Sequence, residues 1–318
     1  MAVASGYRKI IGFLQQYGAL TAVGVEGTGC YGAELARELR KAGITVLEVN
    51  RPNRKNRRQH GKSDPLDAYS AAEAVLAERA TAKPKDRDGF VESVRALRVV
   101  RSSAMKSRTQ TINQITGLLT SAAEEIRSKY RSLHGRKLAR ALLGSRPGSN
   151  LSDPETATRY ALRLLGSRYE ALTMEILQID GHLNELLKLH APDLLGIHGV
   201  GTEVAGQLLI TAGDNPERIG TEAALAALTG TAPLPASSGK TNRHRLSRSG
   251  DRAANSAIHR IVLVRMRHHE ATRAYVTKRT EEGLSKREII RCLKRYVVRE
   301  IHRTLIRHIP PTPAAIAR

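Results

Sequence analysis

The sequence has 318 residues, of which 41% are hydrophobic and only 3% are aromatic, with no tryptophan. It carries 52 Lys and Arg against 30 Asp and Glu, which gives a formal net charge of +22 and a pI near 10.5. The length allows about two domains with real cores. The charge indicates a polyanionic partner, usually nucleic acid, and the few aromatic side chains argue against base stacking as the binding mode.

Other classes of protein are excluded by what the sequence lacks. No apolar run approaches the roughly 20 residues that a membrane-spanning helix needs, and the N-terminus has no signal-peptide pattern. Cys30 and Cys292 lie far apart and match no metal-binding spacing with the 11 histidines, so we expect two reduced thiols. The sequence predicts a cytoplasmic protein, associated with the nucleoid, that has no membrane partner.

The first part of the chain has a β-α-β pattern. Its predicted elements are a short helix, a strand, a helix and a second strand, at residues 6–16, 21–27, 31–43 and 44–49. Two strands joined by a helix indicate a parallel sheet and an α/β domain. The basic loop at residues 51–63 then leads into a helix that starts at Asp64.

The middle of the chain reads as helical from about residue 90, interrupted by a Gly-, Pro- and Ser-rich turn at residues 144–155. Beyond the turn, apolar residues recur at alternating spacings of three and four. They are Leu162, Leu165, Tyr169, Leu172, Ile176, Ile179, Leu183 and Leu186. This heptad pattern predicts an antiparallel coiled coil. The alternative is one helix of a compact bundle.

A third region begins near residue 190. Gly199 and Gly201, followed by Thr202 as an N-cap, predict a tight turn that resembles a helix-hairpin-helix element, whose backbone N–H groups can receive a phosphate. The alternative is a helix–helix corner without a ligand. Beyond this turn we expect a helix near residues 221–229, a loop at residues 230–252 and two further helices to about residue 308.

These patterns predict a fold that combines an α/β part with all-α parts. The predicted divisions are an α/β domain, a coiled-coil helical region, a mostly helical C-terminal domain and a Pro-rich tail, at residues 1–88, 89–190, 191–309 and 310–318.

Three acidic residues stand out in this basic chain. Asp64 precedes a proline and suits a helix N-cap, with Asp67 one turn later. Plain capping and dipole complementation would explain both residues. Glu26, however, ends the first predicted strand, where open α/β sheets form their sites. The three carboxylates together would hold Mg²⁺ or Mn²⁺ against a phosphate.

Residues 230–252 form the most unusual stretch of the sequence. Ser237 and Ser238 lie between a Pro-rich approach and Gly239, so either hydroxyl could attack a phosphodiester. The alternative is that both are ordinary turn residues. His244 and His259 are better explained as phosphate contacts than as bases.

Phosphate contacts are expected from four places, three of them rich in basic residues and the fourth the glycine turn at residues 199–202. The last helix repeats arginine every four residues on one side, with apolar residues on the other; a merely solvated basic face is the alternative. The predicted nucleic-acid contacts are Arg54, Lys55, Arg57, Arg58 and Lys62; Gly199, Gly201 and Thr202; Lys240, Arg243, Arg245, Arg248 and Arg252; and Arg287, Arg291, Arg295 and Arg299.

The stretches VGVEGTGCYG, EVNRPNRKNRRQHGKSDPLDA, GVGTEVAGQLLITAGD, APLPASSGKTNRHRLSRSGDRAANSAIHRIVLVRMR and SKREIIRCLKRY together resemble the DEDD-type insertion-sequence transposases of the "one-hundred-ten" family. The resemblance covers nearly the whole chain. It implies an RNase H-like (RuvC-like) domain, a coiled coil and a serine-bearing transposase domain. It also implies recombination guided by a structured RNA, with Glu26, Asp64 and Asp67 in the metal-binding tetrad and Ser238 as the nucleophile.

The sequence departs from that family in two places. No Asp or Glu occurs before Glu26, so the first aspartate of the tetrad is missing. We therefore expect a truncated RNase H-like domain without catalysis, either because the true start lies upstream of Met1 or because the copy is decayed. Ser249 stands where the family usually has a second glycine, which affects only loop geometry.

Three functions are consistent with these features. The first is a mobile-element recombinase that binds DNA and guide RNA and pairs its protomers through the coiled coil. The second is a catalytically dead nucleic-acid-binding remnant. The third is a metal-dependent, structure-specific nuclease that uses only the acidic residues.

Overall fold

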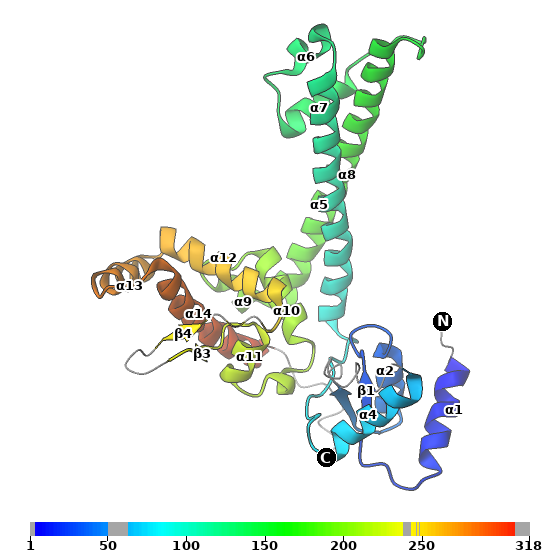
Figure 1. The fold of residues 1–318 in the computed structure, drawn as a ribbon, viewed down its shortest axis with the longest axis vertical. Helices are drawn as coiled ribbons and strands as arrows, with labels where there is room; N and C mark the ends of the chain where they lie inside the picture. The colour runs from blue at the N-terminus through cyan, green and yellow to red at the C-terminus, as the bar shows by residue number, and fades with distance from the viewer. Residues whose placement is uncertain (1–3, 50–62, 238–242, 246, 248, 309–318) are drawn as a thin grey trace. The chain divides into compact units, whose positions relative to one another are not determined.

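The computed structural model of the chain describes residues 4–49, 63–237, 243–245, 247 and 249–308 (Figure 1). The chain divides into two compact units that are each built from separate stretches. Unit 1 comprises residues 1–89, 211–255 and 294–318, and unit 2 comprises residues 90–210 and 256–293. Within the described residues, no helix has the length and apolar character that crossing a membrane requires.

The N-terminal part of unit 1 is a small parallel sheet with helices on both faces (Figure 1). Its elements are α1 (Ala4–Gln15), β1 (Val23–Glu26), α2 (Ala33–Lys41), β2 (Val46–Val49) and α4 (Asp64–Leu76). Val23 pairs with Val46, and Glu26 pairs with Val49. The β-α-β order is the one that the sequence predicts.

Side chains that alternate along the two strands fill two separate cores. Val25 and Val46 pack with Leu39 of α2 and with half-buried residues of α1. On the opposite face, Val49 packs with Ala71 of α4. The sheet is therefore covered on both sides, as parallel sheets are.

The C-terminal part of unit 1 contains short elements that follow α10 (Thr202–Ala212). They are the 3-10 helix η1 (Pro216–Ile219), α11 (Glu222–Leu228), β3 (Leu234–Pro235) and β4 (His244–Arg245). The two strands pair antiparallel as a hairpin that the sequence analysis expected to be an irregular loop. The later residues of α14 (Lys286–His308) also belong to this unit.

Two long helices dominate unit 2, α5 (Phe90–Ser121) and α8 (Pro154–His190). They run antiparallel and side by side (Figure 1). The first residue of α5, Phe90, stacks on the last residue of α8, His190, with 4.7 Å between the ring centroids, which establishes that the two helices run in opposite directions. Further along, Arg101 forms an ion pair with Asp180 at 2.5 Å. The seam of α8 is thus filled by a helix of the same chain.

The seam residues of α8 differ in part from the predicted ones. The buried residues are Leu162, Gly166, Thr173, Ile176, Ile179, Leu183 and Leu187. The predicted Leu165, Tyr169, Leu172 and Leu186 are only half-buried. A pattern of apolar side chains cannot indicate the glycine and the threonine, which are buried without being apolar.

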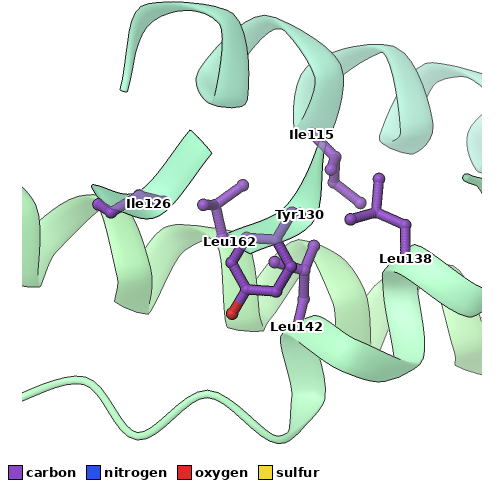
Figure 2. Close-up of a cluster of buried hydrophobic side chains, with 6 residues drawn as sticks. All are labelled: Ile115, Ile126, Tyr130, Leu138, Leu142 and Leu162. Carbon is purple, nitrogen blue, oxygen red and sulfur yellow. The ribbon is translucent and has the colours of Figure 1, made fainter. Parts of the chain in front are cut away.

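The far end of the helical pair is closed by two short helices, α6 (Glu124–Tyr130) and α7 (Gly135–Leu143). Figure 2 shows their apolar side chains pointing toward those of α5 and α8. This core consists of Ile115, Ile126, Tyr130, Leu138, Leu142 and Leu162, all of them buried. It gives the tip of the helical pair a core of its own.

The remaining helices of unit 2 follow α8. They are α9 (Pro192–Gly196), most of α10 (Thr202–Ala212), most of α12 (Arg252–His268), α13 (Glu270–Glu281) and the start of α14. The sequence predicts two helices from about residue 252 onward, whereas the described residues up to 308 contain three. The extra break occurs at His269, whose Nδ1 accepts a hydrogen bond from the backbone N of Thr272 and caps α13.

Candidate active site and nucleic-acid interface

Glu26 lies at the carboxyl end of β1, on the face of the sheet that α4 covers. An added Cβ on Gly24 would meet the carbonyl oxygen of Ala71 at 2.8 Å and Cγ2 of Val75 at 2.9 Å, so this face of β1 touches α4 directly. Side chains two residues apart on a strand share a face. The half-buried Glu26 side chain therefore shares its face of the sheet with α4.

The first turn of α4 carries Asp64 and Asp67. The N-cap is Ser63, whose Oγ accepts a hydrogen bond from the backbone N of Leu66 at 3.4 Å, and Asp64 is the first helical residue. The expectation that Asp64 is the cap was therefore wrong by one position. Because Ser63 already caps the helix, the exposed Asp64 carboxylate is not needed as a cap.

The three acidic residues do not make a complete metal site in the described part of the chain. No group of three or more His, Cys, Asp or Glu side chains among these residues is arranged to hold a metal ion. Carboxylate oxygens are suitable ligands for Mg²⁺, and Glu26 shares its face with the helix that bears the two aspartates. The donor chemistry fits a hard cation, but the grouping is incomplete, so we assign no catalytic step to a metal.

Several predicted contacts lie outside the described residues. In the basic loop these are Arg54, Lys55, Arg57, Arg58 and Lys62, and in the serine-bearing segment they are Ser238, Lys240 and Arg248.

The β3–β4 hairpin fixes the hydrogen-bond partner of the Ser237 hydroxyl. Leu234 pairs with Arg245, and the backbone N of Ala236 donates to the carbonyl oxygen of Arg243 at 2.8 Å. The backbone N of Arg243 in turn donates to Oγ of Ser237 at 3.3 Å. The hydroxyl of Ser237 is thus part of the hairpin closure.

The hairpin and the following helix expose three of the predicted phosphate contacts. Arg243, Arg245 and Arg252 are all exposed, as is His244. In the sequence all four follow the two serines. The charges are therefore accessible to a polyanion.

The turn between α9 and α10 contains Gly199, Gly201 and Thr202. Gly199 has φ +86°, and an added Cβ would lie 3.3 Å from Cγ2 of Ile261, so this glycine allows α12 to pack closely. Gly201 is exposed, with no atom within 4 Å of an added Cβ. Packing therefore explains Gly199, and open space at Gly201 leaves room for a ligand.

The arginines of α14 differ in their surroundings. Arg287 and Arg299 are exposed and Arg291 is half-buried. Arg295 forms an ion pair with Glu222 of α11 at 2.6 Å, and its side chain is only 21% exposed. Because Glu222 lies far from Arg295 in the sequence, the pattern of residues along α14 could not indicate this ion pair.

The sequence analysis also missed a polar cluster on the other face of the sheet. Oγ1 of Thr28 donates to Glu48 at 2.7 Å, and Arg218 approaches the same carboxylate at 3.5 Å. Burial and the nearby Arg218 lower the pKa of Lys85 to about 8. No spacing pattern could reveal this cluster, because its members come from stretches far apart in the chain.

Two family models match the chain. A model of the DEDD transposase domain of the IS110 type, described as "Transposase", matches residues 2–123. A model of the "Transposase IS116/IS110/IS902 family" matches residues 191–277, the stretch that contains the hairpin and both serines. No curated protein sequence matches the chain.

Proposed function

Because the chain belongs to the IS116/IS110/IS902 family of insertion-sequence transposases, we propose that it cuts and rejoins DNA strands by phosphodiester transfer to a serine. Membership of this family implies DNA binding and DNA transposition, and the DEDD domain implies an RNase H-like fold. The observation that carries the serine proposal is the β3–β4 hairpin, which engages Ser237 and itself exposes Arg243 and Arg245.

Ser238 is the proposed nucleophile. The hydroxyl of its neighbour Ser237 accepts a hydrogen bond from Arg243 and belongs to the hairpin. In the proposed step, Oγ of Ser238 forms a bond to phosphorus while the bond from phosphorus to one deoxyribose oxygen breaks. The serine proton is lost, and the departing deoxyribose oxygen gains one to become a hydroxyl. Arg243 and Arg245 would offset the charge of the phosphate.

Divalent metal use is general for DEDD transposase domains. We propose Glu26, Asp64 and Asp67 as the residues of this chain that bind Mg²⁺ or Mn²⁺. Support comes from the chemistry of the donors and from the shared face of Glu26 and α4. A metal bound there would neutralise the three carboxylates beside a phosphate.

A structured guide RNA and a second protomer are further proposed partners. The net charge of +22 is large enough to support binding of more than one polyanion. Within the chain the α8 seam is already filled by α5, so association would use the outer side of α8. That side exposes Tyr160, Leu164 and Met174.

The experiment that tests the proposed function is a covalent-adduct assay. The full chain, its Ser238→Ala variant and its Ser237→Ala variant are incubated with Mg²⁺ and supercoiled DNA carrying the ends of the element. An adduct with the wild type and with Ser237→Ala, but none with Ser238→Ala, would support the serine proposal. No adduct with any of the three proteins would agree with the expectation, drawn above from the metal-binding tetrad, that the chain has no catalysis.

Other outcomes would replace the proposal. Undiminished DNA cutting by Ser238→Ala without an adduct in any sample would indicate a nuclease that uses only the acidic residues. Salt-sensitive DNA binding without adduct or cutting would indicate a nucleic-acid-binding protein without catalysis. Loss of the adduct in Ser237→Ala but not in Ser238→Ala would reverse the assignment of the two serines.

A further inference from the structure

The segment that carries both serines begins and ends at a neck, which we define as residues 228–230 and 249–251. The backbone N of Asp251 donates to the carbonyl oxygen of Leu228 at 2.7 Å. Gly230 and Gly250 have φ of +63° and +88°, and an added Cβ on Gly250 would lie 2.6 Å from the backbone N of Gly230. The two ends of the segment are therefore in direct contact, and neither glycine leaves room for a side chain.

Asn255, in the first turns of α12, ties one side of the neck in place. Its Nδ2 donates to the carbonyl oxygens of Thr229 at 2.8 Å and Gly230 at 3.1 Å. Its Oδ1 accepts a hydrogen bond from Nζ of Lys294 at 2.6 Å. The orientation of the amide is fixed by these partners, since a reversed amide would place its N–H groups against the ammonium group.

Lys294, on α14, is an unusual partner for an asparagine. The residue is only 9% exposed, and burial lowers its pKa. Among the described residues no carboxylate forms an ion pair with it, so its hydrogen bond goes to a neutral amide. A buried ammonium group without a counter-ion is costly. The residue is therefore not explained by an ion-pair role in the core.

A cation that donates to Oδ1 polarises the amide and strengthens the hydrogen bonds made by Nδ2. The chain of contacts thus runs from α14 through Asn255 to the carbonyl oxygens of the neck. On this geometry we infer that Lys294 and Asn255 are positioning residues that hold the neck of the serine-bearing segment closed. The consequence for strand transfer rests on the proposed function, whereas the structural role of the pair does not.

The test measures amide hydrogen exchange of the full chain without DNA. The reporters are the backbone N–H groups of Ala236, Arg243 and Asp251, which bond across the hairpin and the neck. We expect Lys294→Met to speed exchange at these three amides about tenfold to a hundredfold, the effect of losing a hydrogen bond to a charged group. Lys286→Met, which removes an exposed charge from the same helix, is the matched control and should leave them unchanged.

Asn255→Asp is a second variant, chosen because Lys294→Met changes the core. It keeps an acceptor for Lys294 but removes both donors to the neck and places a carboxylate against two carbonyl oxygens. If Lys294 only stabilises the core, this variant should be neutral, because the lysine gains a counter-ion. If the pair holds the neck, exchange at the three amides should rise at least tenfold while the far amides of α7 stay protected.

Unchanged exchange at these amides in both variants would overturn the inference. The adduct assay then separates it from the proposed function. A wild-type chain that forms no serine adduct refutes the proposed function, and the exchange rates still decide the role of Lys294. Where the wild type does form the adduct, both variants should lower its yield at least tenfold without changing DNA affinity.

Discussion

At the scale of single residues, Lys85 gives a testable pH dependence. Its pKa is lowered to about 8 from an ordinary value of 10.5, mainly by burial and also by the charges of Arg218 and Arg87, and Asp251 and Glu48 act in the opposite direction. Between these two values the unfolded chain binds a proton that the folded chain has released, so stability rises with pH. We expect an increase on the order of 2 kcal/mol between pH 8 and 10.5, allowing for partial exposure.

The measurement is urea unfolding of the wild type and of Lys85→Met across this pH range. Other groups titrate there too, so the informative quantity is the difference between the two proteins. The wild-type free energy of unfolding should rise relative to the variant, since only the wild type carries the shifted lysine. If the free energies of unfolding of the two proteins instead changed in parallel with pH, Lys85 would have the same pKa in the folded and the unfolded chain.

The start of α4 supplies a second prediction at this scale. Ser63→Ala should lower the free energy of unfolding by about 1 kcal/mol, because it removes the acceptor for the backbone N of Leu66. Asp64→Ala should cost only a few tenths of a kcal/mol through the helix dipole. Thermal unfolding of both variants measures the difference. A larger loss for Asp64→Ala than for Ser63→Ala would show that Asp64 is the N-cap, as the sequence suggests.

At the scale of elements, α8 contains two glycines that should respond oppositely to the same substitution. An added Cβ on Gly166 would lie 2.8 Å from the carbonyl oxygen of Ala139 and 3.1 Å from Cβ of Leu142, whereas at Gly181 nothing lies within 4 Å. Gly181→Ala should stabilise the protein by about 0.5–1 kcal/mol through helix propensity. Gly166→Ala should destabilise it by about 1–3 kcal/mol, because α7 would be pushed away.

Differential scanning calorimetry of the two variants provides the comparison, with each glycine acting as the control for the other. A rise in Tm for Gly166→Ala equal to that for Gly181→Ala would mean that α7 does not pack closely against α8.

The same helix, α8, shows which features of an element can be predicted from the sequence and which cannot. Its length and its seam at Leu162, Ile176 and Leu183 follow from the heptad spacing. The burial of Gly166 and Thr173 does not, because a hydrophobic pattern cannot identify a glycine on which another helix packs, or a buried polar residue. The β3–β4 hairpin escaped prediction for a related reason: each strand has only two residues, too few to show an alternating pattern.

At the scale of the whole molecule, unit 1 joins residues 1–89 with residues 211–255 and 294–318. Cysteine count, charge and local periodicity say nothing about which distant stretches fold together. One contact that joins two such distant stretches is the hydrogen bond from the side chain of Asn215 to the carbonyl oxygen of Pro84, 131 residues away. The acidic and serine-bearing parts of the candidate site were each identifiable from their local sequence, but their membership of one unit was not.

The net charge of +22 makes the salt dependence of DNA binding the most direct test at this scale. Each arginine that neutralises a phosphate contributes about 0.9 to the slope of log K against log salt concentration. Replacing the exposed Arg243 and Arg245 together by alanine should therefore reduce this slope by about 2 and weaken binding alike on different DNA sequences.

Arg295→Ala is the control for loss of an arginine charge, with half the change of net charge of the double variant. Because Arg295 is paired with Glu222 at 2.6 Å and only 21% exposed, its loss should leave the salt slope nearly unchanged and instead lower the stability of unit 1. Fluorescence anisotropy with labelled duplex DNA over a series of salt concentrations measures both slopes. A reduction in Arg295→Ala half as large as that in the double variant would mean that net charge alone governs binding. A reduction confined to the double variant would place phosphate contacts at the hairpin that carries Ser237, where the proposed strand transfer requires the DNA to lie.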